Sequence, residues 1–464
     1  MLEVHVLARY NVTIPKNGEK KRMNVLIFGL GTLGGGFAAA KYFLDQGDAV
    51  RITDLRSESV LGTPLGILKS LGAETILQEH RQEDFLWADV VIKNPAVPAN
   101  NPLLSLAKRI ETDITFLFSS PLVQNIHIIA ITGTKGKTTT AAAVAHVLNT
   151  GGHEALQCGN MGISGFSILL ELQSRLHKGQ SNPEYLVCEL SSWQIRDMYT
   201  VMGKSLPQFR MVVLTSLFPD HLNSYGDINA YKQDKWLLLS SKSKLIVLSA
   251  QVYDEVKANV DINNHKLIAI ENIPGVKKIE ARFQPAWAIC RKLSLPSKLI
   301  TEALASFRGV PHRQEQIAMT GNFVFINDSA ATIPEAVVFS TASLPWHYVL
   351  ICGGTDKNLD AVGMLKALQR ALSIHVLDGS FSQNKLIPLL KEKQIPYFGP
   401  FGTMKEAFDS AISSAKQHAS IRTENPIISI LLSPGAASFV LFKHEFDRGD
   451  QFRALALQYA SESL

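Results

Sequence analysis

Residues Ile128–Leu148 read IIAITGTKGKTTTAAAVAHVL, an apolar run followed by a glycine-rich turn and an alanine-rich stretch. This pattern predicts a strand, a loop and a helix in direct succession. Glycines in the turn let backbone N–H groups close around phosphate oxygens, and the start of the helix adds the positive end of its dipole. Lys137 can then reach the outer phosphates of a nucleoside triphosphate, and the Thr138 hydroxyl can coordinate Mg²⁺. Ile131 stands where the full P-loop pattern has glycine, so the motif is a shortened variant.

The whole turn is expected to contact the triphosphate. The nucleotide-binding residues predicted from it are Gly133, Thr134, Lys135, Gly136, Lys137, Thr138 and Thr139.

A second glycine-rich turn lies about a hundred residues earlier, in Val25–Ala39, which reads VLIFGLGTLGGGFAA. It fits G-x-G-x-x-G, and Asp54 follows where a dinucleotide fold places its ribose-binding acid. The region ends before a full dinucleotide fold could be completed, so we expect it to bind a nucleoside diphosphate, with Asp54 or Arg56 near the ribose or base. A redox cofactor and a purely structural glycine turn are the alternatives.

Bulk composition indicates a soluble, multidomain enzyme. The 464 residues suggest about three domains, and 46% hydrophobic with 19% charged residues is ordinary for such a protein. A net charge of +5, without a long basic run, gives little support to nucleic-acid binding. No apolar stretch is long enough to cross a membrane. Four widely spaced cysteines without a CxxC pair indicate a reducing compartment, and we expect a cytoplasmic protein.

Strand and helix patterns alternate along the chain, which predicts parallel sheets. Strands are expected at Asn24–Phe28, Tyr185–Glu189, Phe323–Asn327 and Ser373–Leu377, among others. The expected architecture is three consecutive α/β domains: an N-terminal Rossmann-like half-fold, a central P-loop ATPase domain with a mostly parallel sheet, and a C-terminal Rossmann-like domain. Their expected bounds are 23–115, 116–309 and 310–464, with residues 1–22 a tail or a mis-assigned start.

Two polar residues follow strands in the central region. Glu189 ends one strand, and His221 lies shortly after another. The carboxyl ends of parallel strands gather ligands at one edge of a sheet, so both should face the triphosphate loop. A carboxylate and an imidazole in that place suggest a Mg²⁺ site, although Mg²⁺ prefers oxygen ligands and a structural histidine is the alternative for His221.

Eight motifs in a fixed order carry a resemblance to a known family. They are GTKGKTT, CGNMG (Cys158–Gly162), ELSSWQ, PDH with YKQDK (Tyr231–Lys235), GVPHR, INDSAAT (Ile326–Thr332), GGTDK (Gly353–Lys357) and LLSPGAASF with RG (Arg448–Gly449). Together they resemble the Mur ligases, over residues 23–464. The chain is most similar to the members that join D-glutamate to UDP-N-acetylmuramoyl-L-alanine.

The resemblance implies a reaction and a place for each substrate. ATP would phosphorylate the alanyl carboxylate of the sugar nucleotide, and the glutamate amine would attack the acyl phosphate to form an amide. The N-terminal domain would bind UDP, the central domain ATP and the C-terminal domain the amino acid. We expect a monomer whose partners are these small molecules.

The resemblance also assigns roles to residues. The residues that match metal-site residues of the family are Thr138, Glu189, His221 and Lys235. Lys235 also matches a lysine that family members carbamylate. The expected catalytic residues are Lys137, Glu189, His221 and Lys235. The expected UDP-sugar contacts are Gly29, Gly31, Thr32, Leu33, Asp54, Arg56, Asn94, Asn160, Ser191 and Gln194. Further ATP contacts would be Arg313 and Asp328. The acceptor contacts would be Thr332, Lys357 and Ser438, the last at an expected helix start.

Three departures from the family pattern leave alternatives open. Ala330 stands where a lysine is usual, and Glu445 replaces an aromatic residue that touches the acceptor. Both leave the identity of the acceptor open, and the segment NDSAATIPEA, which contains Ala330, also resembles a variant subgroup that lacks this lysine and adds L-glutamate. An asparagine pair expected near adenine is absent from Gly275–Pro285, so the adenine contacts stay unassigned. More distant alternatives are a folylpolyglutamate synthetase, an NAD-dependent dehydrogenase and a non-catalytic nucleotide-binding protein.

Overall fold

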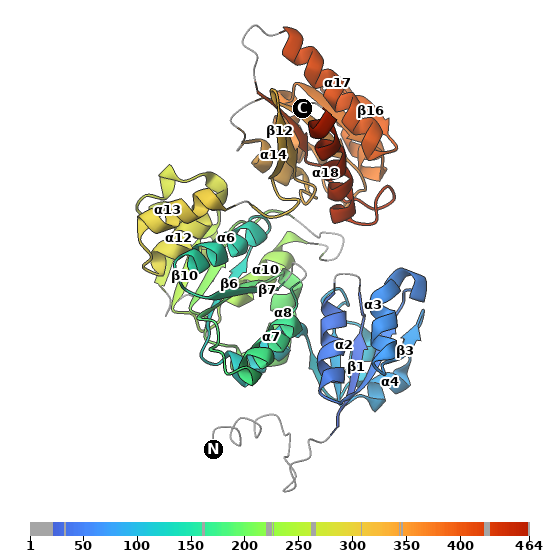
Figure 1. The fold of residues 1–464 in the computed structure, drawn as a ribbon, viewed down its shortest axis with the longest axis vertical. Helices are drawn as coiled ribbons and strands as arrows, with labels where there is room; N and C mark the ends of the chain where they lie inside the picture. Colours follow the sequence, from blue (N-terminus) through green and yellow to red (C-terminus); the bar gives the residue numbers. More distant parts are fainter. Residues whose placement is uncertain are drawn as a thin grey trace. The chain divides into compact units, whose positions relative to one another are not determined.

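The computed structural model describes residues 22–31, 34–159, 163–219, 225, 227–260, 266–307, 309–342, 344, 347–421 and 427–462. Within these residues the strands form three sheets that follow one another along the chain (Figure 1). This confirms the predicted α/β class with three successive sheets. The expected tail lies almost wholly outside the described residues.

The first sheet has five parallel strands in the order β3-β2-β1-β4-β5. Its strands are β1 (Asn24–Phe28), β2 (Ala49–Asp54), β3 (Glu74–Leu77), β4 (Val90–Lys93) and β5 (Ile110–Glu111), and its helices are α2 (Gly35–Asp45), α3 (Glu58–Ser70) and α4 (Gln82–Trp87). The next helix, α5 (Asp113–Ser119), packs against helices of the second sheet.

The second sheet has six parallel strands in the order β11-β10-β9-β6-β8-β7. The strands are β6 (His127–Thr132), β7 (Ala155–Gly159), β8 (Tyr185–Glu189), β9 (Met211–Leu214), β10 (Leu245–Leu248) and β11 (Lys266–Ala269). The helices are α6 (Lys137–Thr150), α7 (Gly165–His177), α8 (Ser192–Met202), α10 (Ile228–Leu239), α11 (Ala250–Asn259), α12 (Gln284–Lys292) and α13 (Ser297–Ser306).

The third sheet has the order β12-β13-β17-β14-β15-β16, and β12 alone pairs antiparallel to its neighbour. The strands are β12 (Glu315–Thr320), β13 (Phe323–Asn327), β14 (His347–Gly353), β15 (Ser373–Leu377), β16 (Phe398–Phe401) and β17 (Ile428–Leu432). The helices are α14 (Pro334–Ala342), α15 (Leu365–Arg370), α16 (Ile387–Glu392), α17 (Met404–Ile421) and α18 (Glu445–Glu462).

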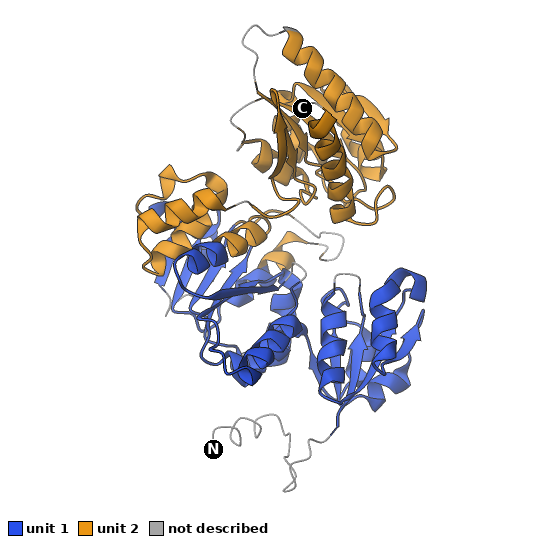
Figure 2. Cartoon of the chain, in the orientation of Figure 1, with its two compact units in different colours: residues 1–133, 144–215, 233–272 blue, residues 134–143, 216–232, 273–464 orange. Residues whose placement is uncertain are grey.

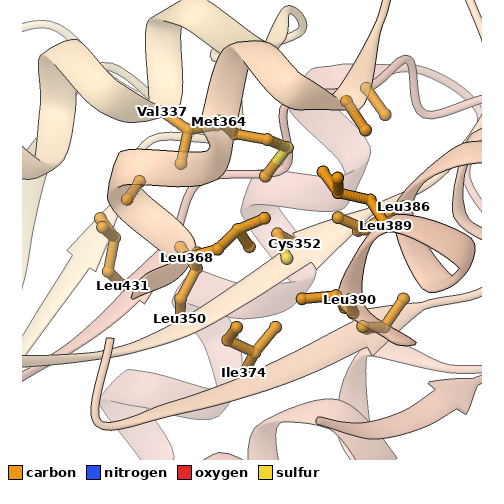
Figure 3. Packing of buried hydrophobic residues seen from close by; sticks show 14 of the residues in the cluster. Val337, Leu350, Cys352, Met364, Leu368, Ile374, Leu386, Leu389, Leu390 and Leu431 are labelled. Carbon is orange, nitrogen blue, oxygen red and sulfur yellow. The ribbon is translucent and has the colours of Figure 1, made fainter. Parts of the chain in front are cut away.

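Apolar side chains on both faces of the third sheet form its core. Leu350 and Leu431 belong to a cluster with Met364 and Leu390, shown in Figure 3. The next side chains along the strands, such as Val349, belong to a separate cluster with residues of α17 and α18. Successive side chains of a strand point to opposite faces, so a fully apolar strand needs helices on both sides.

The chain forms two compact units (Figure 2). The first contains the described residues up to 133 together with 144–215 and 233–272, and therefore the first two sheets. The second contains 134–143, 216–232 and the described residues from 273 onward, with the third sheet. No helix among the described residues is long and apolar enough to span a bilayer.

Candidate active site

Strand β6 sets the position of the central candidate site because it pairs with β8 on one side and β9 on the other. In these registers Ile131 lies opposite Glu189, and Thr132 lies opposite Leu214. All three strands are parallel, so their carboxyl ends meet at one edge. The Thr132 hydroxyl also donates to Leu190 O over 2.8 Å, which joins the ends of β6 and β8 beyond the ladder.

Lys235 reaches this edge from α10. Its side chain is 1% exposed, and Nζ lies 3.0 Å from Gly133 O and 3.4 Å from Thr132 Oγ1. A fully buried ammonium is costly unless acceptors surround it, and these backbone and hydroxyl oxygens are such acceptors. Glu189 is also buried, at the end of β8. Two of the predicted catalytic residues thus belong to the same end of one sheet.

The triphosphate loop is held by the segment that follows β9. The backbone N–H of Thr134 donates to Ser216 O over 2.9 Å, and that of Lys135 donates to Ser216 Oγ over 2.8 Å. The Thr134 hydroxyl accepts from the Phe218 N–H at 2.9 Å and lies 3.1 Å from the Tyr231 hydroxyl. These contacts fix the loop from one side, and the helix α6 begins directly after it at Lys137.

The loop's key side chains have distinct surroundings. Lys137 Nζ donates to Thr134 O over 3.0 Å, so the lysine folds back over its own loop. The Thr138 hydroxyl is buried, and within the described part of the chain its Oγ1 has no hydrogen-bond partner. Buried hydroxyls are normally hydrogen-bonded, so this oxygen has unused capacity to bind a ligand.

Four predicted site residues, Thr32, Leu33, Asn160 and His221, lie outside the described residues. Among the residues that are described, no cluster of three or more His, Cys, Asp or Glu side chains could hold a metal ion.

In the first sheet, Asp54 turns toward the first glycine loop. It is buried at the end of β2, accepts from the Gly31 N–H at 3.1 Å and accepts from the Arg56 N–H at 2.9 Å. Gly29 and Gly31 have φ of 85° and 67°, which favour glycine. Asp54 therefore stabilises the loop's conformation, a role that the sequence pattern did not indicate.

Asn94 closes the loop from the other side. Its Nδ2 donates to Gly29 O over 3.2 Å, and its Oδ1 accepts from the Ala96 N–H at 3.0 Å. A Cβ added to Gly31 would lie 3.0 Å from Asn94 Nδ2, so the side chain fills the space that a bulkier residue would need.

Ser191 and Gln194 form the N-terminal cap of α8. The Gln194 N–H donates to Ser191 Oγ over 3.3 Å, and the Ser191 N–H donates to Gln194 Oε1 over 3.0 Å. Gln194 also hydrogen-bonds Asp113, whose pKa is raised by burial and lowered in part by its donors, including the Gly165 N–H. These hydrogen bonds give Ser191 and Gln194 a capping role, and the capping-box spacing was the signal for it that sequence reasoning missed. Their contact with the sugar nucleotide stays a prediction.

Asp328 is enclosed by donors at the carboxyl end of β13. It accepts from Ser433 Oγ at 3.0 Å, from the Gln314 N–H at 3.1 Å and from the Ser340 hydroxyl. Burial raises its pKa to about 6, while these hydrogen bonds and Arg313 act in the opposite direction. Through the Gln314 N–H, Asp328 thus connects the end of β13 to the segment that contains Arg313.

The predicted acceptor residues lie on loops that are bonded to one another. Thr355 and Ala437 exchange backbone hydrogen bonds of 2.9 and 3.1 Å, and the Gly435 N–H donates to Ala331 O over 2.8 Å. These bonds connect the segments of Thr332, Lys357 and Ser438, which follow the parallel strands β13, β14 and β17.

The expected helix start at Ser438 is wrong. The helix α18 begins only at Glu445, and Ser438 is buried in the preceding turn. The bonds of Ala437 to Thr355 hold this segment in a bridge, and Val440 has φ of 83°, which a right-handed helix does not allow.

Sequence reasoning also missed Ser216, Tyr231 and Asp113, which hold the loops around them. Ser216 lies two residues after the end of the buried strand β9, and Tyr231 belongs to the YKQDK motif, so position was a usable signal for both. Asp113 had none, because its partners are far away in sequence.

Comparisons with known proteins agree with this architecture. Residues 131–286 match the model of the Mur ligase middle domain. The chain is 32% identical to the UDP-N-acetylmuramoylalanine–D-glutamate ligase of Borreliella afzelii (strain PKo), over 94% of this chain and 98% of that protein. It is 29% identical to the ligase of the same name from Treponema pallidum (strain Nichols), over 93% and 96%.

Among solved structures, UDP-N-acetylmuramate-alanine ligase from Thermotoga maritima aligns with a TM-score of 0.55 and 17% identity, over 95% of this chain and all of that one. This likeness supports the fold alone. The identity to the Borreliella protein extends over nearly the whole of both chains. The chain therefore belongs to the Mur ligase family, and it is an ATP-dependent ligase of the acid–amino acid type.

Proposed function

We propose that the protein joins D-glutamate to UDP-N-acetylmuramoyl-L-alanine at the expense of ATP, in the synthesis of peptidoglycan precursors. The observation that carries this proposal is the full-length similarity to several ligases named for that reaction. Residues 23–115 would bind the UDP group, residues 116–309 ATP and residues 310–464 the amino acid. The enzyme would act as a cytoplasmic monomer.

The triphosphate loop would hold ATP through its backbone N–H groups and Lys137. The helix α6 starts at Lys137, so the N–H groups of its first turn and the positive end of its dipole point toward the loop. Transfer of a phosphoryl group spreads negative charge over the phosphate oxygens, and positioned cations stabilise that charge. Lys137 would supply one such cation.

One Mg²⁺ would be held by Thr138 and Glu189, and a second Mg²⁺ would have His221 as a ligand. Both would neutralise charge on the phosphates when bound. The buried Thr138 hydroxyl fits this role, because no described residue satisfies it. Carboxylate and hydroxyl oxygens are also the ligands that Mg²⁺ prefers.

Lys235 would act as a carbamate. Its amine lies 3.0 Å from Gly133 O, at the end of β6. The buried Glu189 ends β8, which pairs with β6. Carbamylation replaces the positive charge of the Lys235 amine with a negative charge. A negative charge beside the phosphate loop would help to bind Mg²⁺.

The acceptor amine would attack the acyl phosphate from the third sheet. Thr332, Lys357 and Ser438 lie on loops bonded to one another, and a lysine and two hydroxyls can orient the carboxylates of an amino acid. Attack forms the amide and releases the phosphate together with an alanyl oxygen.

L-Glutamate is the second candidate acceptor, because two residues depart from the family pattern. Ala330 is buried and brings no charge, and Glu445 puts a carboxylate at the start of α18. Glu445 O accepts from the Ser329 hydroxyl at 2.7 Å, so the helix start is joined to the INDSAAT segment.

Phosphate release with each glutamate isomer tests the proposed reaction. With UDP-N-acetylmuramoyl-L-alanine and ATP, we expect turnover at least about 100-fold faster with D-glutamate than with L-glutamate, because polar contacts that fix both carboxylates cannot fit both isomers. A preference for L-glutamate would reverse the acceptor assignment. Absence of turnover with any amino acid would refute the ligase function.

Lys137→Ala separates the two nucleotide sites. We expect ATP turnover to fall by about 10³-fold, because a cation is lost from the transferring phosphate. Binding of the sugar nucleotide, measured by calorimetry, should stay within about twofold, because the proposed UDP contacts belong to the first glycine loop and do not include Lys137. Lys41→Ala, on the exposed face of α2, is the matched control and should leave both unchanged. Loss of both properties in Lys137→Ala would contradict separate sites.

Lys235→Ala and Lys235→Arg test carbamylation. Both should lose about 10²-fold or more of the ligase rate, because the anion is lost. A short-chain carboxylic acid should partly restore Lys235→Ala, where it can occupy the freed space, but not Lys235→Arg. Equal failure of rescue in both variants, with a wild-type rate that does not respond to bicarbonate, would show that no carbamate is used.

A further inference from the structure

A buried ion pair joins the first and second sheets inside the first compact unit. Lys93 Nζ and Asp197 Oδ2 lie 2.7 Å apart, and the two side chains are 3% and 6% exposed. Lys93 ends β4, and Asp197 lies in the middle of α8. The two residues are 104 positions apart in sequence, so only the fold brings them together.

Stability alone does not account for this pair. Burial raises the pKa of Asp197, and the neighbouring Lys93 offsets only part of that effect. Moving two charges out of water costs several kcal/mol per ion, and apolar residues of similar volume often serve stability as well or better. A charged pair does add a fixed direction and distance, which two apolar side chains do not.

At one end, the pair is connected to the first glycine loop. Lys93 Nζ also donates to Asn94 O over 3.3 Å. The Asn94 side chain in turn donates to Gly29 O over 3.2 Å. The ammonium of Lys93 therefore holds the backbone of the residue that closes this loop.

At the other end, the pair is connected to the edge of the second sheet. Arg196, the neighbour of Asp197 on α8, donates to Asp234 Oδ1 over 3.0 Å. Asp234 precedes Lys235 on α10, and Lys235 donates to Gly133 O. Two successive residues of α8 are thus connected to both places through intermediates. Asp197 is linked to the first glycine loop through Lys93 and Asn94. Arg196 is linked to the end of β6 through Asp234 and its neighbour Lys235.

We propose that Asp197 is a positioning residue for the sugar nucleotide: it fixes the first glycine loop relative to α8, so that the UDP-tethered carboxylate arrives at the end of β6. The proposal rests on the proposed function. It assigns Asp197 no contact with substrate. Its effect should be absent for UDP alone, which needs only the first loop, and present for the complete substrate, which must reach both places.

Three variants and one control test this role. Asp197→Asn removes the charge, and Lys93→Met removes its partner. The double variant Lys93→Met/Asp197→Leu replaces the pair by an apolar contact that restores packing without direction. Asp84→Asn is the matched control, because Asp84 is an equally buried carboxylate paired with Arg51 within the first sheet. Asp84→Asn should lower the stability of the protein and leave kcat/KM for the sugar nucleotide unchanged.

We expect kcat/KM for UDP-N-acetylmuramoyl-L-alanine to fall about tenfold in Asp197→Asn and in the double variant, since small misplacements of a reacting group are costly. The Kd of UDP and the KM of ATP should stay within about twofold. The Tm of the double variant should equal or exceed the Tm of Asp197→Asn. This separation of stability from kcat/KM is the outcome that a merely structural pair would not give.

The proposal is overturned if the double variant regains wild-type kcat/KM together with stability, or if UDP alone loses affinity as much as the full substrate. Should Asp197→Asn not fold, the double variant decides the question. If the wild-type protein lacks ligase activity, the proposed function fails separately. The positioning role is then judged by calorimetry, comparing UDP-N-acetylmuramoyl-L-alanine with UDP in wild type and double variant.

Discussion

The parallel pairing of β6 with β8 and β9 is the constraint on which the central candidate site depends. It brings the ends of three strands to one edge, with Ile131 opposite Glu189 and Thr132 opposite Leu214. Parallel strands must be joined by long crossovers, so residues far apart in sequence are delivered to the same edge. The glycine loop begins where β6 ends, so the loop and the ends of the neighbouring strands lie at the same edge of the sheet.

Buried charges and hydrogen bonds then hold the loops that leave the strands. Lys235 donates to Gly133 O, and Asp54 accepts from the Gly31 N–H of the first glycine loop and from the Arg56 N–H. In the third sheet Asp328 accepts hydrogen bonds from the Ser433 hydroxyl and from the Gln314 N–H. Each group would be costly to bury without these partners, so each one favours a single loop conformation. A loop fixed in this way can bind phosphate or a carboxylate without first being ordered.

The sequence was sufficient for the fold class and for strands whose apolar runs end at polar residues. Tyr185–Glu189 and Phe323–Asn327 were predicted with the bounds that the structure has. Partnerships across the chain could not be predicted, since Lys93 and Asp197 carry no pattern that links them. The helix start expected at Ser438 was wrong because a local glycine-rich turn resembles a helix start, while the bridge between Ala437 and Thr355 that prevents one is a long-range contact. Of the candidate site residues, Thr32, Leu33, Asn160 and His221 lie outside the described residues. The roles assigned to the other candidate site residues also stay predictions.

Oxygen transfer tests the central claim, that ATP activates the alanyl carboxylate of a sugar nucleotide. UDP-N-acetylmuramoyl-L-alanine labelled with ¹⁸O in that carboxylate is incubated with ATP and D-glutamate, and the released phosphate is analysed by mass spectrometry. Because the amine displaces phosphate from an acyl phosphate, one labelled oxygen should leave with each phosphate. Amide formation with unlabelled phosphate, or ATP hydrolysis without any transfer of label, would contradict the account.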